Sequence, residues 1–184
     1  MHIGFDLDKI FINSPPFIPG RILERMYRKA DHNQLHFRIP SRPEQFLRRC
    51  IHLPFLRQPI IENLYFLRSF PKKQHKLYLI SSRFGFLKKI TMELVKRHKL
   101  DEIFDEMYFN FKDDQPHIFK NAMVQKLNLH LYVDDDLALL QYLAKRNKKI
   151  KFFWLTKRGN RRSTTEKNIF AIKDLSAILL NNYG

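Results

Sequence analysis

Six short apolar segments, separated by stretches with helical periodicity, constrain the fold of this chain more than any other feature of its sequence. The segments are rich in β-branched and aromatic residues, which is typical of strands, and between them apolar residues recur at the spacing of one helix face. The expected strands are 2–5, 76–80, 106–110, 130–133, 150–155 and 168–172, and the expected helices are 84–98, 116–126, 137–146 and a last one from the N-cap Asp174 to about residue 182. Strands that alternate with helices predict an α/β fold with a doubly wound parallel sheet of the Rossmann-like kind.

Residues 9–75 break this alternation, because the stretch is too long for a single crossover between two strands. It contains helix-like pieces at about 21–29, 43–51 and 59–70, which are separated by prolines. We therefore expect an α/β core formed by residues 1–8 and 76–184 and a small α-helical insertion formed by residues 9–75. From residue 9 to residue 76 there are 14 Lys or Arg and 4 Asp or Glu, an excess of ten positive charges.

Composition excludes several classes of protein. Cys50 is the one cysteine, so neither an intrachain disulfide nor a four-cysteine zinc site can form. The N-terminus lacks the basic start and apolar run of a signal peptide, and no stretch reaches the roughly 18 apolar residues of a membrane helix. We therefore expect no membrane partner and a reducing cytoplasm as the location. The net charge of +16 favours polyanionic partners, nucleic acid among them, although basic residues that merely solvate helix surfaces would give the same balance.

Acidic residues directly follow two of the expected strands. Asp6 and Asp8 end the first strand, and the run 134–136 (Asp-Asp-Asp) ends the fourth. Ligands of open α/β sheets bind outside the carboxyl ends of the strands, so these groups converge if the two strands are neighbours. Crowded carboxylates repel one another, and a hard divalent cation such as Mg²⁺, with phosphate and water as further ligands, relieves that repulsion. The alternative is that these acids simply end strands in solvent.

A phosphate ligand also needs hydrogen-bond donors and positive charge. Ser81 ends the second expected strand and can donate through its hydroxyl group, while Ser82 and Arg83 open the following helix, whose N-terminal amides attract anions. Lys120, on the helix before the fourth strand, is a candidate for a cationic contact, and Lys126 on the same helix is the alternative. A single serine or lysine of this kind is more often an ordinary polar residue.

Together these residues resemble the four motifs of the haloacid dehalogenase superfamily. A hydrophobic strand with Asp-x-Asp appears at 5–11 (Phe-Asp-Leu-Asp-Lys-Ile-Phe), a strand with Ser at 79–81 (Leu-Ile-Ser), a lysine at Lys120, and a strand with paired acids at 132–135 (Tyr-Val-Asp-Asp). Their order and strand contexts match from the start of the chain to about residue 155. The resemblance is specific for the superfamily and not for one member, and the second Asp of the first motif resembles its phosphatase branch.

The resemblance implies roles in phosphoryl transfer. Asp6 would attack phosphorus and form an aspartyl-phosphate. Asp8 would protonate the leaving oxygen and then activate water. Ser81, Ser82 and Lys120 would bind the transferring phosphoryl group, and Lys120 would also steady the charge of Asp6.

The resemblance also implies a magnesium site. Mg²⁺ would be held by the carboxylate of Asp6, the backbone carbonyl of Asp8 and an acid of the fourth motif. Alignment with that motif makes Asp135 the direct ligand and Asp134 an outer helper, so that Asp136 would be structural.

Two features adapt the family pattern to this chain. Family members commonly have Gly directly after Asp-x-Asp, whereas this chain has Lys9, whose side chain either crowds the loop or adds a phosphate contact. The insertion at 9–75 resembles a cap between the first and second motifs, and caps in this superfamily select substrates and shut out water.

The leading hypothesis is a Mg²⁺-dependent phosphomonoester hydrolase. The basic insertion indicates an anionic phosphorylated substrate, such as a nucleotide or a nucleic-acid end. The alternative is a catalytically weak or silent phosphatase fold that binds RNA or another polyanion; the net charge and Lys9 favour it, and the intact set of acids disfavours it. A phosphotransferase with the same aspartyl-phosphate is a third hypothesis. The histidines of the insertion lack metal-ligand spacing and are expected to be ordinary surface or core residues; they are His32, His36, His52 and His75.

Overall fold

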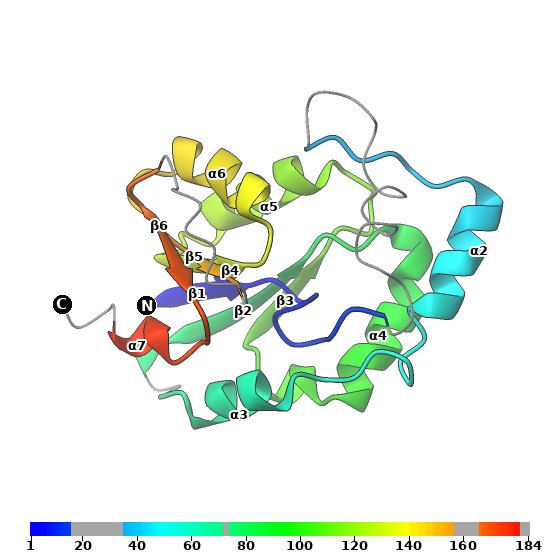
Figure 1. Ribbon diagram of the computed structural model, residues 1–184, viewed down its shortest axis with the longest axis horizontal. Helices are drawn as coiled ribbons and strands as arrows, with labels where there is room; N and C mark the ends of the chain where they lie inside the picture. The colour runs from blue at the N-terminus through cyan, green and yellow to red at the C-terminus, as the bar shows by residue number, and fades with distance from the viewer. Residues whose placement is uncertain (16–34, 72–73, 157–165, 181–184) are drawn as a thin grey trace.

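The structure, a computed structural model, describes residues 1–15, 35–71, 74–156 and 166–180, and these form an α/β fold around one parallel sheet (Figure 1). The sheet has six strands in the order β3-β2-β1-β4-β5-β6. The strands are β1 (His2–Phe5), β2 (Lys76–Ser81), β3 (Glu106–Phe109), β4 (Leu131–Asp134), β5 (Lys151–Leu155) and β6 (Ile169–Ile172). All six expected strands and the doubly wound parallel sheet are confirmed, with strand ends within one residue of expectation.

The chain order of the strands reverses between β1 and β4, which lie side by side in the centre of the sheet. Phe5 of β1 is opposite Leu79 of β2 on one side and Val133 of β4 on the other. Parallel sheets of this order bind ligands at the reversal point, outside the carboxyl ends of the strands. The residues that follow β1 and β4 therefore meet at the edge where a site is expected.

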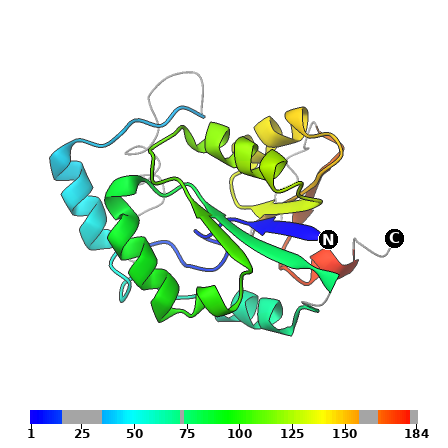
Figure 2. The ribbon, with the colours of Figure 1, turned by 180° about the vertical axis from the view of Figure 1, so that it is seen from behind.

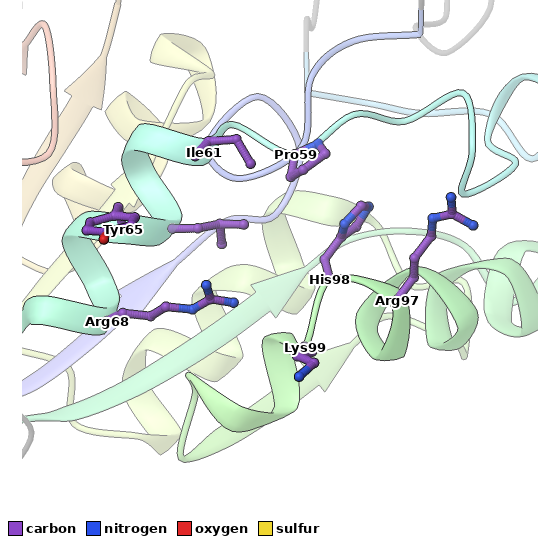
Figure 3. A pocket seen from close by; sticks show the side chains of 8 residues that line it. Pro59, Ile61, Tyr65, Arg68, Arg97, His98 and Lys99 are labelled. Atoms are coloured by element: carbon purple, nitrogen blue, oxygen red, sulfur yellow. The ribbon is translucent and has the colours of Figure 1, made fainter.

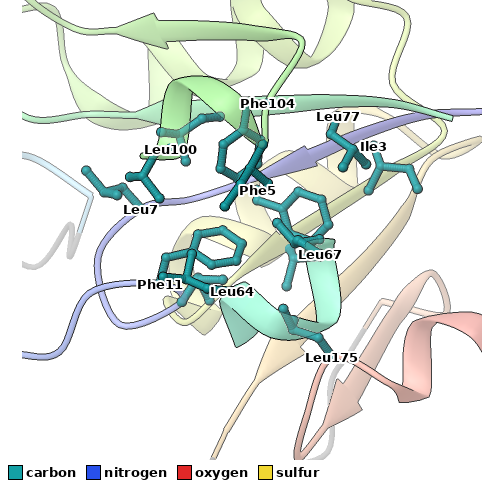
Figure 4. Close-up of a cluster of buried hydrophobic side chains, with 14 of the residues drawn as sticks. Ile3, Phe5, Leu7, Phe11, Leu64, Leu67, Leu77, Leu100, Phe104 and Leu175 are labelled. Carbon is teal, nitrogen blue, oxygen red and sulfur yellow. The ribbon is translucent and has the colours of Figure 1, made fainter. Parts of the chain in front are cut away.

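Helices cover both faces of the sheet (Figures 1 and 2). One face carries α3 (Ile61–Ser69), α4 (Lys88–Arg97) and α7 (Ala177–Leu180), and the other carries α5 (Pro116–Lys126) and α6 (Leu137–Arg146). Because side chains alternate along a strand, Leu77 and Leu79 of β2 pack with the first group, whereas Tyr78 and Ile80 pack with the second. Figure 4 shows the first cluster, in which Leu64 and Leu67 of α3 lie against Phe5 and Phe11.

Two helices begin later than the sequence indicates. The helix expected at 84–98 starts with a short 3-10 turn, η2 (Gly85–Leu87), and continues as α4. Ser82 and Arg83 therefore precede the helix and do not open it. The last helix begins at Ala177, three residues after its expected N-cap Asp174, because the Asp174 carboxylate accepts from the backbone and hydroxyl of Ser176 and closes a turn there.

The segment 9–75 contributes to the core at both of its ends. Ile10, Phe11 and Ile12 are fully buried in the same cluster as β1 and α3. Two of the three expected helices are present, as α2 (Arg42–Ile51) and α3, and the piece at 21–29 lies outside the described residues. In Figure 1 α2 lies beyond the carboxyl ends of the strands. A cap that spans residues 9–75 stays a prediction.

Among the residues that the structure describes, no helix is both long enough and apolar enough to cross a membrane.

Candidate active site

Three carboxylates meet where β1 and β4 end. One oxygen atom each of Asp6, Asp134 and Asp135 lies within 4.8 Å of the others. The backbone N–H of Asp6 donates to the carbonyl of Val133 at 3.0 Å, which extends the β1–β4 pairing into the site. The sequence predicts that acids after the first and fourth strands converge if these strands are neighbours. Since β1 and β4 are neighbours, these three carboxylates do converge.

Lys120 lies between two of these carboxylates. Its Nζ donates to Oδ1 of Asp6 at 2.8 Å and to Oδ2 of Asp134 at 2.7 Å, and all three side chains are buried. Burial alone would lower the pKa of Lys120, but the carboxylates of Asp134 and Asp6 raise that pKa well above its usual value. The alternative lysine, Lys126, lies over the ring of Tyr108 at 5.4 Å from its centroid and takes no part in this group.

Asp6 is an unusual carboxyl group because it is buried among charges of both signs. Burial raises its pKa, the ammonium of Lys120 opposes this shift, and the carboxylate of Asp134 adds to it. The amount of positive charge beside Asp6 therefore determines what fraction of this carboxyl group is ionised.

Asp134 and Asp135 are adjacent in sequence but have different surroundings. Asp134 is buried, and its oxygens accept from Lys120, from the Tyr132 hydroxyl at 3.0 Å and from the Asp136 N–H at 3.0 Å. The Asp135 side chain is partly exposed and pairs with Lys9 at 2.7 Å. Protein donors thus bind both oxygens of Asp134. Asp135 lies at the open side of the site, where Lys9 binds it.

Asp136 and Gly4 have structural roles beside the site. The Asp136 carboxylate accepts from the N–H groups of Ala138 and Leu139, at 3.0 and 3.3 Å, and so forms the N-cap of α6. A Cβ on Gly4 would lie 2.9 Å from the Tyr132 ring and 2.5 Å from a Leu129 methyl group. Glycine at this position therefore lets Tyr132 pack on β1 and hold Asp134.

Asp8 does not join the other three carboxylates, because two arginines bind it. Nε and Nη2 of Arg83 each donate to an Asp8 oxygen at 2.8 Å, and Arg57 donates to Oδ1 as well. Burial would raise the pKa of Asp8, but the guanidinium groups of Arg83 and Arg57 hold it well below its usual range. Neither partner is predicted by the sequence: Arg83 follows the Ser81-Ser82 motif, but no sequence signal marks Arg57.

His52 lies beside this group of charges, in a buried position on the C-terminal side of α2. Its Nδ1 donates to the carbonyl of Arg48 at 2.9 Å. Burial, together with the positive charges of Arg83 and Arg57, lowers the pKa of His52 to about 3. A neutral imidazole here agrees with the expectation of an ordinary core residue.

The two serines of the second motif have different environments. Ser81 ends β2, is buried, and its hydroxyl has no hydrogen-bond partner within the described part of the chain. A buried hydroxyl without a partner is costly, so a ligand oxygen near Ser81 would satisfy it. Ser82 is half-buried in the loop before η2.

Two cavities lie away from this site. A cavity of about 210 Å³ between α3 and the end of α4 is lined by cationic side chains that include Arg68, Arg97 and Lys99 (Figure 3). A larger one, of about 720 Å³, lies at the amino ends of the strands, beside His130 and Lys151. Neither is lined by the carboxylates described above.

Comparisons with known proteins identify the fold. No family model matches the chain, and no curated protein sequence matches it. Similar solved structures include a protein of Thermotoga maritima with the provisional name β-phosphoglucomutase, with a TM-score of 0.65 and 16% identity over 99% of this chain and 98% of that one. A haloacid dehalogenase-like hydrolase of Streptococcus pneumoniae has a TM-score of 0.60 and 14% identity, covering 98% and 97% of the two chains.

A third similar structure contains ligands. It is D,D-heptose 1,7-bisphosphate phosphatase of B. bronchiseptica in complex with magnesium and phosphate, with a TM-score of 0.57 and 12% identity over 100% of this chain and 99% of that one. These likenesses show that the chain has the fold of the haloacid dehalogenase-like hydrolases, as the motifs of its sequence indicate.

Proposed function

We propose that the chain is a Mg²⁺-dependent phosphomonoester hydrolase that works through an aspartyl-phosphate. The observation that carries the proposal is the group formed by Asp6, Lys120, Asp134 and Asp135 at the reversal point of a haloacid dehalogenase-like sheet. A nucleophile candidate, a buried cation and a set of oxygen ligands are thus placed at one edge, although they come from distant parts of the sequence.

The donor set fits a magnesium ion, because all of its side chains offer hard carboxylate oxygens. The carboxylates of Asp6 and Asp135 and the backbone carbonyl of Asp8 would hold it, with Asp134 as a helper whose oxygens already accept hydrogen bonds. A bound Mg²⁺ supplies positive charge that neutralises the phosphoryl group and keeps Asp6 ionised.

Each step of the proposed reaction is carried out by particular residues of the chain. A carboxylate oxygen of Asp6 forms a bond to phosphorus while the bond from phosphorus to the leaving oxygen breaks, and that oxygen takes a proton from Asp8. Asp8, now a carboxylate, accepts a proton from water as the water oxygen attacks phosphorus and the bond from phosphorus to the Asp6 oxygen breaks. Inorganic phosphate leaves and Asp6 is regenerated. Ser81, Ser82 and Lys120 hold the phosphoryl oxygens throughout.

The contacts of Asp8 set a condition on these reaction steps. While Arg83 and Arg57 bind its carboxylate, Asp8 stays ionised and its oxygens are turned to the guanidinium groups. Proton donation therefore requires Asp8 to leave at least one of the two arginines. The proposal includes such a rearrangement when substrate binds.

The substrate we propose is a multiply charged phosphomonoester, with a nucleotide or a nucleic-acid end as the leading class. The segment 9–75 supports this, since it carries much of the positive charge and α2 lies beyond the carboxyl ends of the strands (Figure 1). Arg49 on α2 is exposed, and its Nε donates to the carbonyl of Phe86 in η2, the turn that follows the second motif, at 3.2 Å.

The test is Mg²⁺-dependent release of phosphate by the purified full chain. p-Nitrophenyl phosphate serves as the generic substrate, and a panel of phosphorylated metabolites and of 5′- and 3′-phosphorylated oligonucleotides identifies the class. We expect turnover with Mg²⁺ and none with EDTA. Absence of metal-dependent turnover on every member of the panel would contradict the proposal.

A second candidate function is a catalytically silent fold that binds RNA or another polyanion. Two observations favour it: the ammonium of Lys9 is bound to Asp135, and Asp8 is bound by two arginines. Filter binding of labelled RNA in the presence of EDTA separates the candidates. Tight binding of unphosphorylated RNA without turnover of any phosphoester supports this second function.

A further inference from the structure

We propose that the ammonium group of Lys9 is a tethered competitor that occupies the acidic cluster in place of a divalent cation. This group occupies Asp135, so a divalent cation gains that carboxylate only by displacing Lys9. The inference rests on the proposed function, because it takes Asp6 and Asp135 as magnesium ligands.

The geometry puts the Lys9 ammonium on the open side of the cluster. Its Nζ lies 2.7 Å from Oδ2 of Asp135, a residue 126 positions away in sequence. The backbone of Lys9 has φ of 61°, in the left-handed region that a lysine adopts at a cost. Its N–H donates to the carbonyl of Ile12 at 2.7 Å, which fixes the turn. The loop thus holds a non-glycine residue in a glycine-like conformation, with its side chain directed to the acid.

Lys9 and Lys120 differ in how easily each can leave the carboxylates. The Lys120 side chain is 3% exposed and bridges two buried acids, whereas the Lys9 side chain is 52% exposed. A long exposed lysine gives up an ion pair at small cost, since solvent replaces the carboxylate. Lys9 is therefore the ammonium group that leaves its carboxylate when a divalent cation binds.

The charge count shows why the ion pair matters for metal binding. Three carboxylates, those of Asp6, Asp134 and Asp135, face two ammonium groups, those of Lys9 and Lys120. An excess of one negative charge attracts a divalent cation less than the excess of two that would be present without Lys9. A displaced Lys9 stays tethered beside the site and repels the bound cation, which weakens its binding further.

The proposal predicts a change in magnesium affinity that needs no substrate. Replacing Lys9 by Met keeps an unbranched chain and removes the charge, and we expect it to tighten Mg²⁺ binding about tenfold, as the loss of one partly buried ion pair and of one repelling charge would do. Lys9→Gly, which suits the left-handed backbone, should tighten binding in the same direction and guards against a folding defect in Lys9→Met.

Lys99 offers a matched control within the chain. It is also a lysine with a left-handed backbone, φ 53°, and it also pairs with a carboxylate, that of Glu102 at 3.8 Å. Lys99→Met therefore makes the same change of side chain, charge and ion pairing at the far end of α4. Asp135→Asn serves as the variant that should weaken Mg²⁺ binding.

Isothermal titration of MgCl₂ into the substrate-free full chain gives the affinities, with the fluorescence of Trp154 recorded in parallel. Trp154 is the one tryptophan, and its Nε1 donates to the carbonyl of Asp135 at 3.0 Å, so it reports on this loop. We expect a Kd about tenfold lower for Lys9→Met than for the wild type, and an unchanged Kd for Lys99→Met.

Three results would overturn the proposal. A Kd of Lys9→Met and Lys9→Gly within twofold of the wild type, or above it, means that Lys9 does not compete. Equal tightening of Mg²⁺ binding in Lys99→Met means that the change in net charge, and not the position of Lys9, is responsible. If Mg²⁺ binds normally and only the Lys9 effect is absent, the proposed function stands; if no variant binds Mg²⁺, that function fails as well.

Discussion

The ammonium group of Lys120 lies 2.8 Å from Oδ1 of Asp6, although the two residues are 114 positions apart in the sequence. The same ammonium lies 2.7 Å from Asp134, so that helix α5 is tied to the ends of both central strands. This bridge links the fold to the chemistry, because the group that would bind the phosphoryl oxygens also compensates two buried carboxylates.

Replacing Lys120 by Met should therefore reduce both stability and activity. Two buried carboxylates without their partner cost about 3 to 5 kcal/mol of the free energy of unfolding at pH 7. Urea unfolding followed by circular dichroism measures the loss. Lys126→Met is the control from the same helix, and its contact with the Tyr108 ring should cost less than about 1 kcal/mol. Equal losses in the two variants would show that the bridge does not stabilise the fold.

Asp136→Ala should lower stability by about 1 kcal/mol, because it removes the side-chain acceptor of the α6 N-cap. Asp136→Asn keeps an acceptor oxygen and should lose only a few tenths of that amount. Urea midpoints for both variants check the difference, and Mg²⁺ affinity should stay near the wild-type value in both. A large loss of Mg²⁺ affinity in Asp136→Asn would instead make Asp136 a metal ligand.

His52 should make the folded protein sensitive to mild acid. Its pKa is about 3 in the fold and about 6.5 in an unfolded chain, so the unfolded state binds the proton more tightly. The stability that neutral His52 permits is complete above pH 6.5 and is lost as the pH falls from there towards 3. Between pH 6.5 and pH 5 the loss is about 2 kcal/mol.

His52→Asn should remove that part of the pH dependence while its amide retains a donor for the Arg48 carbonyl. The free energy of unfolding, measured at pH 6.5 and pH 5 for wild type and variant, gives the difference directly. His36→Asn, at a half-exposed position, is the control. If His52→Asn loses as much stability between pH 6.5 and pH 5 as the wild type does, His52 is not the responsible group.

Arg49 tests whether the positive charge of α2 helps to capture substrate. Exposed charges act over a screening length of about 8 Å at physiological salt. Arg49→Glu should lower kcat/KM for a multiply charged substrate about threefold at low salt and less at higher salt, with kcat little changed. Lys145→Glu makes the same charge change at an exposed position on α6. Identical effects in both variants, or none in Arg49→Glu, would assign the basic residues to the general surface.

Much of the fold could be predicted because its signals are local. Strands such as 131–134 are short apolar runs, and α5 begins at Pro116, a residue that suits a first helical turn. The late start of α4 escaped prediction, since the 3-10 turn at 85–87 has the same apolar spacing as a helix.

The site could be predicted only in part. Asp6, Lys120 and the acids after β4 stand at motif positions, and the sheet order brings them together. The binding of Asp8 by Arg57 could not be predicted, because Arg57 reaches the site from the segment 9–75, whose path depends on packing and not on periodicity. The same holds for the pairing of Lys9 with Asp135.

The most direct test of the central claim is the turnover number of Asp6→Asn with p-nitrophenyl phosphate at saturating Mg²⁺. An amide cannot form the aspartyl-phosphate, so we expect kcat to fall about 10³-fold or more while circular dichroism and thermal unfolding show a folded protein. A folded Asp6→Asn protein that keeps wild-type turnover would contradict the assignment of Asp6 as the nucleophile.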